Sequence, residues 1–251
     1  VDGEAAADAG MGDASADVAS RGPGGPSFPI PSAAHVGLPN PALYEVRKDV
    51  VVDRVTGLHW ERFAGDDSTF EAAVAHCQSL RSEGRTDWRL PRRLELVTIV
   101  DDTARPTIDA AAFPDTPSAY FWSTSPVVQD EGMVWVVYFG QGLTEYASTR
   151  GRLARARCVR GEGLPTGPRF VRVGDVVRDG ATGLTWERTS SSPVEHPVAG
   201  LLCRDARTGD VFDWRLPTAR ELQSIVDDAR SEPALDPVFA GTPAEGRLWI
   251  Q

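Results

Sequence analysis

The sequence contains no long hydrophobic run, and acidic side chains outnumber basic ones. Crossing a bilayer takes ~20 consecutive and mostly apolar residues, so we expect no membrane insertion. The formal net charge is -10 over 251 residues, whereas a nucleic-acid interface must neutralise phosphates with basic side chains. We therefore expect no nucleic-acid partner. No secretion signal is visible at the start of the sequence.

Sequence signatures of catalysis are also missing. There is no HExxH, no GxSxG and no glycine-rich phosphate loop, and the 4 histidines are scattered. In an internal repeat that is described below, Thr185 and Leu202 stand at the positions of His59 and His76. We therefore assign no catalytic residues and expect that the protein is not an enzyme.

Metal and cofactor signatures are sparse. No CxxC and no pair of histidines at ligand spacing is present, so zinc is not expected. The acidic pairs Asp101-Asp102 and Asp227-Asp228, with a third in GDDS (65–68), leave calcium as an alternative, because calcium prefers oxygen ligands. Acidic residues in solvated loops are commoner than calcium sites, so we assign no metal and no cofactor.

The sequence does contain an internal repeat. DWRLP begins at Asp87 and again at Asp213, and the same step along the chain joins Trp60 to Trp186. One step shared by different residue types indicates a duplicated folding unit. The pentapeptide can be a ligand loop, but its recurrence favours a framework role, with Trp in the core and the charged residues paired or capping backbone groups. The expected framework residues are Trp60, Asp87, Trp88, Arg89, Pro91 and Trp122, then Trp186, Asp213, Trp214, Arg215 and Pro217.

Four segments follow from the repeat and the composition. Residues 1–39 are rich in Ala, Asp, Gly, Ser and Pro, a composition that buries too little apolar surface to offset its ordering entropy. We expect them to be a disordered spacer. Residues 42–161 are expected to form a first domain, 162–168 a Gly/Pro linker and 169–251 a second domain. The second copy stops before the residues that would match the end of the first, so we expect it to lack the final strands.

Each unit is expected to combine helices with antiparallel strands. Strand signals flank a Thr56-Gly57 turn, a helix with a Ser68/Glu71 capping box covers 66–84, and a second helix begins at Pro91. Short aromatic and β-branched segments follow from residue 120. This order of elements predicts the α+β class. In the second unit, Pro193 and Pro197 are expected to interrupt the first helix.

The 3 cysteines have unequal positions in the repeat. Cys77 and Cys203 are equivalent, whereas the counterpart of Cys158 would fall beyond the last residue. We predict a Cys77–Cys158 disulfide and an unpaired Cys203; the alternative is a pair of buried free thiols. The disulfide implies an oxidising compartment.

Arginines are concentrated in RGRLARARCVR (150–160). On a strand, Arg150 and Arg152 project to one face, as do Arg155 and Arg157. A row of guanidinium groups suits the sulfate or carboxylate groups of an acidic polysaccharide; the alternative is an edge strand protected by charge. The candidate binding residues are Arg150, Arg152, Arg155, Arg157 and Arg160.

The motifs together resemble the Lcl C-terminal domain family of bacteria. The resemblance rests on VVDRVTGLHWER (51–62), GRTDWRLPRRLEL (84–96), YFWSTSP (120–126) and ARCVRG (156–161), and it covers nearly all of 42–161 and the first part of a second copy. It implies secreted or surface-attached proteins with a compact α+β fold close to the C-type lectin-like group. The family's namesake domain ends a collagen-like adhesin and binds sulfated glycosaminoglycans. The calcium- and sugar-binding tripeptides of true C-type lectins, Glu-Pro-Asn and Trp-Asn-Asp, are absent here.

We therefore expect a non-catalytic, extracellular or cell-surface binding or adhesion module. Its expected partner is an acidic polysaccharide or the surface of a host or neighbouring cell. An alternative is a structural surface protein whose tandem domains bind no small molecule. A third hypothesis is an enzyme related to formylglycine-generating enzymes, whose chemistry needs reactive cysteines.

Overall fold

The computed structural model describes residues 27–232, 234–239 and 248–251. The fold mixes α and β and is mostly β, with one four-stranded and two three-stranded sheets that are all antiparallel. None of the helices within the described ranges is both long and apolar enough to span a bilayer. We refer to residues 27–161 as the N-terminal half and to residues 169–251 as the C-terminal half.

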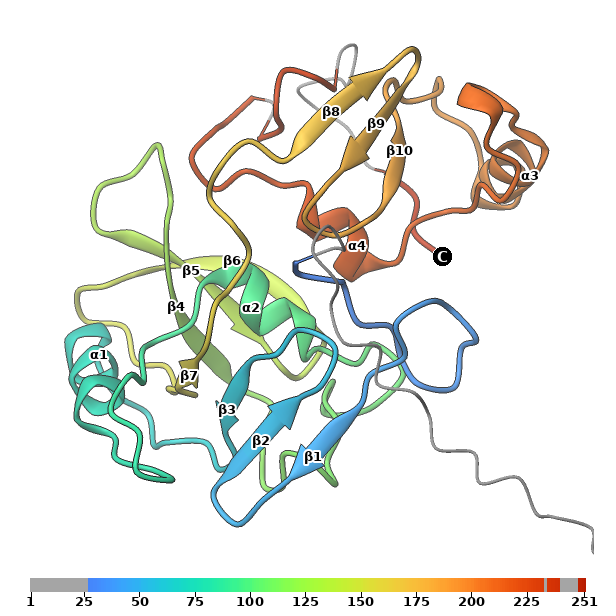
Figure 1. The fold of residues 1–251 in the computed structure, drawn as a ribbon. Coiled ribbons are helices and arrows are strands. Elements are labelled where there is room, and N and C mark those ends of the chain that lie inside the picture. The colour runs from blue at the N-terminus through green and yellow to red at the C-terminus, as the bar shows by residue number, and fades with distance from the viewer. Residues whose placement is uncertain (1–26, 233, 240–247) are drawn as a thin grey trace, which may run out of the picture.

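The N-terminal half consists of two sheets and two helices (Figure 1). One sheet has the order β1-β2-β3-β7 and the other β4-β5-β6. Two apolar clusters fill the space between these elements, one around Trp60 and α2 and the other around Trp122, Cys77 and Cys158. The elements are β1 (Tyr44–Val46), β2 (Val50–Asp53), β3 (His59–Glu61), α1 (Phe70–Ser79), α2 (Arg93–Thr98), β4 (Tyr120–Pro126), β5 (Met133–Tyr138), β6 (Leu143–Ser148) and β7 (Val159–Arg160).

The C-terminal half contains elements in the same order as the start of the N-terminal half. Its sheet has the order β10-β9-β8, and in Figure 1 it lies above α4 with α3 beside it. Five of its elements begin 126 residues after a counterpart: 44 and 170, 50 and 176, 59 and 185, 70 and 196, 93 and 219. The elements are β8 (Phe170–Val173), β9 (Val176–Asp179), β10 (Thr185–Glu187), α3 (His196–Asp205), the 3-10 helix η1 (Thr208–Asp210) and α4 (Ala219–Ser224).

The turn between the second and third strands of each half is held by a buried aspartate. Asp53 accepts hydrogen bonds from the Val55 amide at 2.8 Å and from the Thr56 hydroxyl at 2.7 Å. Asp179 makes the matching bonds with Ala181 and Thr182 at 3.0 and 2.8 Å. A glycine with φ of 76° follows each threonine, in a backbone region where glycine is favoured. Burial raises the pKa of Asp53.

Residues 248–251 lie where the N-terminal half begins β4. The Trp249 indole donates to the Val194 carbonyl at 2.7 Å, as Trp122 does to Ser68 at 3.0 Å. Trp249 also packs edge-on against the first residue of α3, as Trp122 does against that of α1. The described C-terminal half contains no counterpart of β5, β6 or β7.

Two helix predictions differ from the structure. The N-cap of α1 is Thr69, whose hydroxyl accepts from the Ala72 amide, so Ser68 does not form the expected capping box; its backbone pairs with Ala154 instead. Pro197 does not interrupt α3, which has ten residues like α1. Pro197 lies in the first turn, where the missing N–H has no helical partner to lose.

Residues 27–39 do not form the expected spacer. Phe28 and Ile30 are buried in the same apolar cluster as Trp60, and the Phe28 amide donates to the Ala181 carbonyl of the C-terminal half at 2.8 Å. The two buried side chains and the hydrogen bonds from the Phe28 amide and to the Pro31 carbonyl hold the start of this segment between the halves. The rest of the predicted spacer, residues 1–26, lies outside the described residues.

The two halves meet through α2 and α4 and through two buried arginines (Figure 1). The Arg93 side chain is 2% exposed and its Nε donates to Asp228 at 2.6 Å; its Nη1 bonds to the Gln223 side chain. Arg220 of α4 donates to the Thr98 carbonyl of α2 at 3.3 Å. A buried charge is costly unless it is paired. Separating the halves would leave these arginines without their partners, so the contacts favour one arrangement of the halves.

Replacing Arg93 with alanine is expected to destabilise the chain by about 2 kcal/mol, because it leaves Asp228 and Gln223 without their partner. Urea unfolding followed by tryptophan fluorescence measures this change. Arg92→Ala, which removes the exposed neighbouring arginine, serves as the control and is expected to change stability by less than about 0.5 kcal/mol. Equal unfolding midpoints for the two variants would show that the ion pair does not hold the halves together.

Candidate functional site

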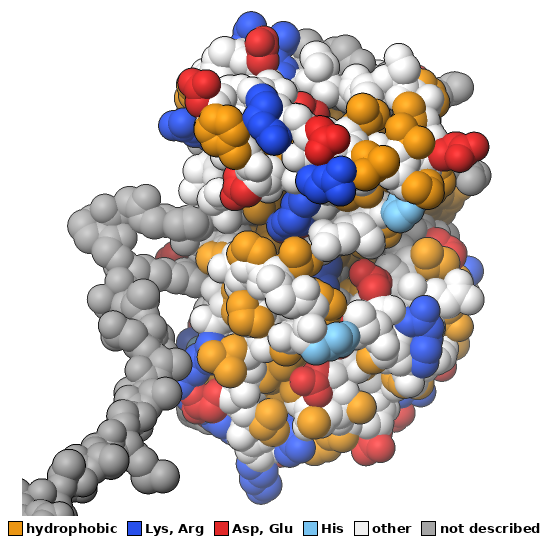
Figure 2. All heavy atoms as spheres, turned by 90° about the vertical axis from the view of Figure 1, so that its right-hand side faces the viewer, with side chains coloured by type: hydrophobic (Ala, Val, Ile, Leu, Met, Phe, Trp, Pro, Cys, Tyr) orange, Lys and Arg blue, Asp and Glu red, His pale blue; other side chains and the backbone are white. Residues whose placement is uncertain are grey.

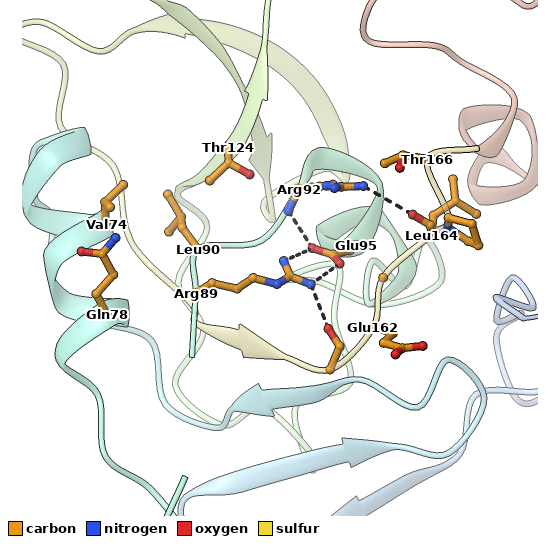
Figure 3. A pocket seen from close by; sticks show the side chains of 13 residues that line it. Val74, Gln78, Arg89, Leu90, Arg92, Glu95, Thr124, Glu162, Leu164 and Thr166 are labelled. Carbon is orange, nitrogen blue, oxygen red and sulfur yellow. Dashed lines mark hydrogen bonds and ion pairs between the residues drawn. The ribbon is translucent and has the colours of Figure 1, made fainter. Parts of the chain in front are cut away.

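A pocket of about 660 Å³ opens between α1, α2 and the segment that follows β7 (Figure 3). In Figure 3, Val74 and Gln78 from α1 lie on one side and Leu164 and Thr166 on the other, with Arg89 and Glu95 between them. Its volume lies within the range of small-molecule sites. The lining residues are Val74, Gln78, Arg89, Leu90, Arg92, Glu95, Thr124 and residues 161–166.

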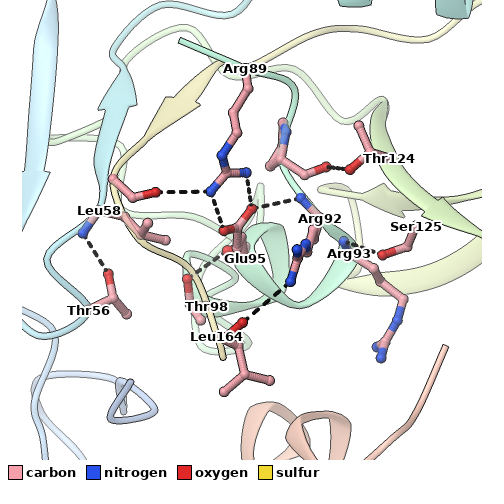
Figure 4. Close-up of polar contacts among 12 residues, drawn as sticks. Thr56, Leu58, Arg89, Arg92, Arg93, Glu95, Thr98, Thr124, Ser125 and Leu164 are labelled. Atoms are coloured by element: carbon pink, nitrogen blue, oxygen red, sulfur yellow. Dashed lines mark hydrogen bonds and ion pairs between the residues drawn. The ribbon is translucent and has the colours of Figure 1, made fainter. Parts of the chain in front are cut away.

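An ion pair between Arg89 and Glu95 forms the floor of the pocket (Figure 4). The two terminal nitrogens of Arg89 donate to the two Glu95 oxygens at 2.7 and 2.6 Å. Glu95 also accepts the Arg92 amide at 2.7 Å, so it caps α2 as well as pairing. The hydrogen bonds from Arg89 to Glu95 raise the pKa of Arg89. This arginine has little capacity left for a ligand.

Arg92 is the cation that remains available in the pocket. Its side chain is exposed, and among the described residues its guanidinium makes one hydrogen bond, which is a long one of 3.4 Å from Nη1 to the Leu164 carbonyl. A guanidinium carries five N–H groups, so Arg92 has donors left for a ligand. Val74 adds apolar lining on the side of α1 and Leu164 on the opposite side. The site can therefore bind an anionic group together with an apolar or ring surface.

The predicted linker forms one wall of this pocket. Gly163 lies so close to α2 that a Cβ built on it would come within 2.0 Å of a Glu95 oxygen. Only glycine permits this approach without a shift of the backbone. Residues 161–166 therefore line the pocket as a strap, and the predicted 162–168 linker contacts the N-terminal half at Gly163 and Leu164.

The C-terminal half has the counterpart of the Arg89–Glu95 ion pair but no counterpart of Arg92. Arg215 pairs with Glu221 at 2.7 Å and Thr218 caps α4. Thr218 occupies the position of Arg92, so the free guanidinium has no counterpart there. Of the two halves, the N-terminal one therefore carries the candidate binding site.

The arginine run at 150–160 does not form the predicted row. Arg150 and Arg152 are exposed, and Arg152 lies over the Tyr120 ring with its Cζ 4.9 Å from the centroid. Arg155 and Arg160 pair with Asp67 and Asp87 at 3.3 and 3.0 Å. The alternation failed because only Val159–Arg160 is a strand here.

Arg157 was wrongly predicted as a surface binding residue. It is fully buried, and its guanidinium donates to the Glu61 and Arg62 carbonyls at 2.8 and 2.7 Å and to the Thr116 hydroxyl at 2.7 Å. Its Cζ lies 4.9 Å from the centre of the Phe113 ring. Burial lowers the pKa of Arg157 to about 10, so it stays charged at neutral pH. Its role is structural, because it connects the backbone of Glu61 and Arg62 to Thr116 inside the core.

The cysteines are arranged as the repeat predicted. Cys77 of α1 and Cys158 form a disulfide that spans 81 residues, and Cys203 is free. Burial, with a smaller contribution from the charge of Glu187, raises the pKa of Cys203. A raised pKa leaves little thiolate at neutral pH, so Cys203 is a poor nucleophile.

The expected framework residues fall into two groups. In the N-terminal half, Trp60, Trp88 and Trp122 are buried, Arg89 pairs with Glu95, and the hydrogen bond from Arg160 lowers the pKa of Asp87. Pro91 is buried and precedes α2. In the C-terminal half, Trp186, Trp214 and Pro217 are half-buried and thus more exposed than their counterparts, whereas Arg215 is half-buried like Arg89 and Asp213 is exposed like Asp87.

One cluster within the described ranges brings possible metal ligands together, formed by Glu61, His76 and Cys158. It does not suit a metal ion, because the Cys158 sulfur is in the disulfide and His76 bonds to Glu61 at 2.9 Å. Among the acidic residues considered for calcium, Asp101 accepts from the Thr103 amide at 2.9 Å and Asp228 pairs with Arg93.

The pocket was missed in the sequence, although a signal was present. RLPRRLE (89–95) and RLPTARE (215–221) place an arginine and a glutamate six residues apart in both copies. This spacing predicts the ion pair in both halves. The two segments differ at the position of Arg92, where the C-terminal half has Thr218. The contribution of the strap to the pocket is not visible in composition.

The geometry defines a disulfide-bonded α+β module with an arginine-bearing pocket in its N-terminal half. The chain belongs to the Lcl C-terminal domain family, whose model matches residues 49–160 and 175–251. The two matched segments are consistent with one complete and one shorter copy. No curated protein matches the chain.

Proposed function

We propose that the chain is a non-catalytic binding module that takes an acidic polysaccharide at the Arg92 pocket. The observation that carries this proposal is the exposed guanidinium of Arg92, which lines the pocket together with the half-buried Leu164. A carboxylate or sulfate would accept from Arg92, while a sugar ring would lie against Leu164. Arg150 and Arg152 are exposed as well, but they lie outside the pocket.

The compartment and the ancestry of the chain belong to the same proposal. The buried Cys77–Cys158 disulfide supports an oxidising, extracellular or cell-surface location. The 126-residue step between corresponding elements supports a tandem duplication. Two helices with antiparallel sheets and a disulfide from α1 to the closing strand are compatible with a C-type lectin-like domain. We propose adhesion to a host or neighbouring cell surface as the role.

An enzyme of the formylglycine-generating type is disfavoured by the same cysteines. Cys77 and Cys158 are joined to each other, and the pKa of Cys203 is raised. A structural role is the stronger alternative, because the buried pair Arg93–Asp228 fixes the two halves together. In that case the tandem module would be a rigid spacer without a ligand.

Replacing Arg92 with threonine, the residue at the equivalent position of the C-terminal half, is expected to weaken binding at least ~10-fold. That factor corresponds to about 1.4 kcal/mol, which is the scale of one charge-assisted hydrogen bond. Calorimetry with an oligogalacturonate and with a heparin hexasaccharide measures the loss and distinguishes carboxylate from sulfate recognition.

Arg152→Thr is the matched control, since it removes an exposed arginine that lies outside the pocket. Its affinity is expected to equal that of the unmodified chain. If Arg152→Thr weakened binding and Arg92→Thr did not, the ligand would lie on the arginine run. Absence of binding by the unmodified chain to both probes would favour the structural role.

A further inference from the structure

The charged residues that line the pocket between α1, α2 and the strap balance each other. Four of the lining residues are charged: Arg89 and Arg92 are basic, and Glu95 and Glu162 are acidic. Arg89 and Glu95 neutralise one another in the ion pair at the floor of the pocket. The formal charge of the lining is therefore zero, and the two residues left over have opposite signs.

Glu162 is the acid that remains available in the pocket, as Arg92 is the base. It is exposed on the strap, and within the described ranges its carboxylate takes part in no hydrogen bond or ion pair. In Figure 3, this carboxylate lies apart from the ion pair of the floor. The pocket therefore offers one cation and one anion to a ligand.

The two available charges are near enough for one ligand to contact both. The Arg92 guanidinium donates to the Leu164 carbonyl at 3.4 Å, and Glu162 is two residues before Leu164 in the chain. Two residues of backbone span at most ~7 Å, so neighbouring sugars of one oligosaccharide reach both groups. Gln78 and Thr166 add neutral polar groups to the lining, which suit sugar hydroxyls.

A ligand that carries only negative charge matches this lining poorly. It would pair with Arg92 and place its other negative groups near Glu162, on a chain whose formal net charge is -10. Figure 2 shows basic and acidic side chains interspersed over the face on the side of α3. Like charges that face each other across an interface oppose binding, so the pocket favours a ligand with both signs of charge.

We infer that the ligand of this pocket is an acidic polysaccharide in which a carboxylated sugar alternates with a sugar that has a free amine. The carboxylate accepts hydrogen bonds from Arg92, and the ammonium group pairs with Glu162. Glu162 is then a specificity-determining residue, because it separates such a polymer from one that is only anionic. The inference deepens the proposed function and rests on it, since it concerns the ligand of the same pocket.

Two oligosaccharides that differ in one group test the inference. The first alternates glucuronate with N-acetylglucosamine and carries only negative charge. The second is the same oligosaccharide after N-deacetylation, which leaves a free amine on every second sugar. Calorimetry at about pH 6 keeps the amine protonated and the glucuronate ionised. The unmodified chain is expected to bind the N-deacetylated form at least ~3-fold more tightly, which is the scale of one exposed ion pair.

Glu162→Gln removes the charge of the side chain and keeps its size. This variant is expected to bind the N-deacetylated oligosaccharide ~3-fold more weakly than the unmodified chain does, and to bind the N-acetylated form as well as before or better. The preference for the free amine is thereby lost. Glu131→Gln is the matched control, because it removes an exposed acid that lies outside the pocket, and it should keep the preference.

Equal affinities of the unmodified chain for the two oligosaccharides, both lowered by Arg92→Thr, would overturn the inference and leave the polysaccharide site in place. A preference that survived Glu162→Gln would also overturn it. So would a Glu162→Gln variant that bound both oligosaccharides more tightly, because the acid would then only compete with the ligand for Arg92. Absence of binding to either oligosaccharide would overturn the proposed function and this inference together.

Discussion

Removing the Cys77–Cys158 disulfide is expected to lower the free energy of unfolding by about 4 kcal/mol. The bond closes a loop of 81 residues, and a cross-link over a loop of that length restricts the unfolded chain strongly in the chain-entropy description. Both sulfurs are buried among Val50, Val52 and Trp122, so the native packing around them is close. The double variant Cys77→Ala/Cys158→Ala avoids introducing free thiols into this core.

Urea unfolding of the double variant and of the unmodified chain, both without reductant, measures the difference. Cys203→Ala is the control, because its thiol is in no disulfide and its removal is expected to cost less than about 1 kcal/mol. Thiol titration of the unfolded protein should give one thiol before reduction and three after it. An unfolding midpoint shared by the double variant and the control would rule out a structural disulfide.

The disulfide was predictable because the positions of the cysteines in the two repeats can be compared without knowing the local structure. Cys77 and Cys203 share the repeat step, and Cys158 has no counterpart within the chain. The framework role of DWRLP was predictable for a similar reason. A tryptophan between charged residues that recurs in one chain has to be explained by something both copies share, and Trp88 is indeed buried beside the Arg89–Glu95 pair.

Sequence patterns failed to predict the structure where contacts between residues far apart in the chain set the course of the backbone. Alternation placed Arg155 and Arg157 on one face, but residues 154–158 are held by bridges to Ser68 and Phe121 and not by a regular ladder. Composition made residues 162–168 a linker, whereas Gly163 lies against Glu95 because it has no Cβ. Phe28 and Ile30 lie in a segment of otherwise mostly small and polar residues, and the core buries both of them.

The candidate site combines predictable and unpredictable parts in the same way. The repeated spacing of Arg89 and Glu95 predicts an ion pair in each half. The exposed state of Arg92 and the buried state of Arg93, its neighbour in the chain, depend on how α2 lies against α4. Two adjacent arginines thus have separate roles, one at the pocket and one at the interface of the halves.

Arg157→Met is expected to destabilise the chain by about 3 to 5 kcal/mol, although it removes a residue that sequence alone placed on the surface. The guanidinium satisfies the carbonyls of Glu61 and Arg62 and the Thr116 hydroxyl in the core. Each buried acceptor left unpaired costs about 1–3 kcal/mol. Methionine restores part of the volume, so the loss reports the polar contacts more than a cavity.

Arg152→Met separates this structural role from a binding role. Arg152 is exposed and contacts the Tyr120 ring, so its replacement is expected to change stability by less than about 1 kcal/mol. Thermal and urea unfolding of both variants measure the difference, and heparin affinity is measured below their unfolding midpoints. An Arg157→Met protein as stable as Arg152→Met but unable to bind heparin would return Arg157 to the ligand site. The buried position of its guanidinium between Phe113 and Phe121 argues for the opposite result.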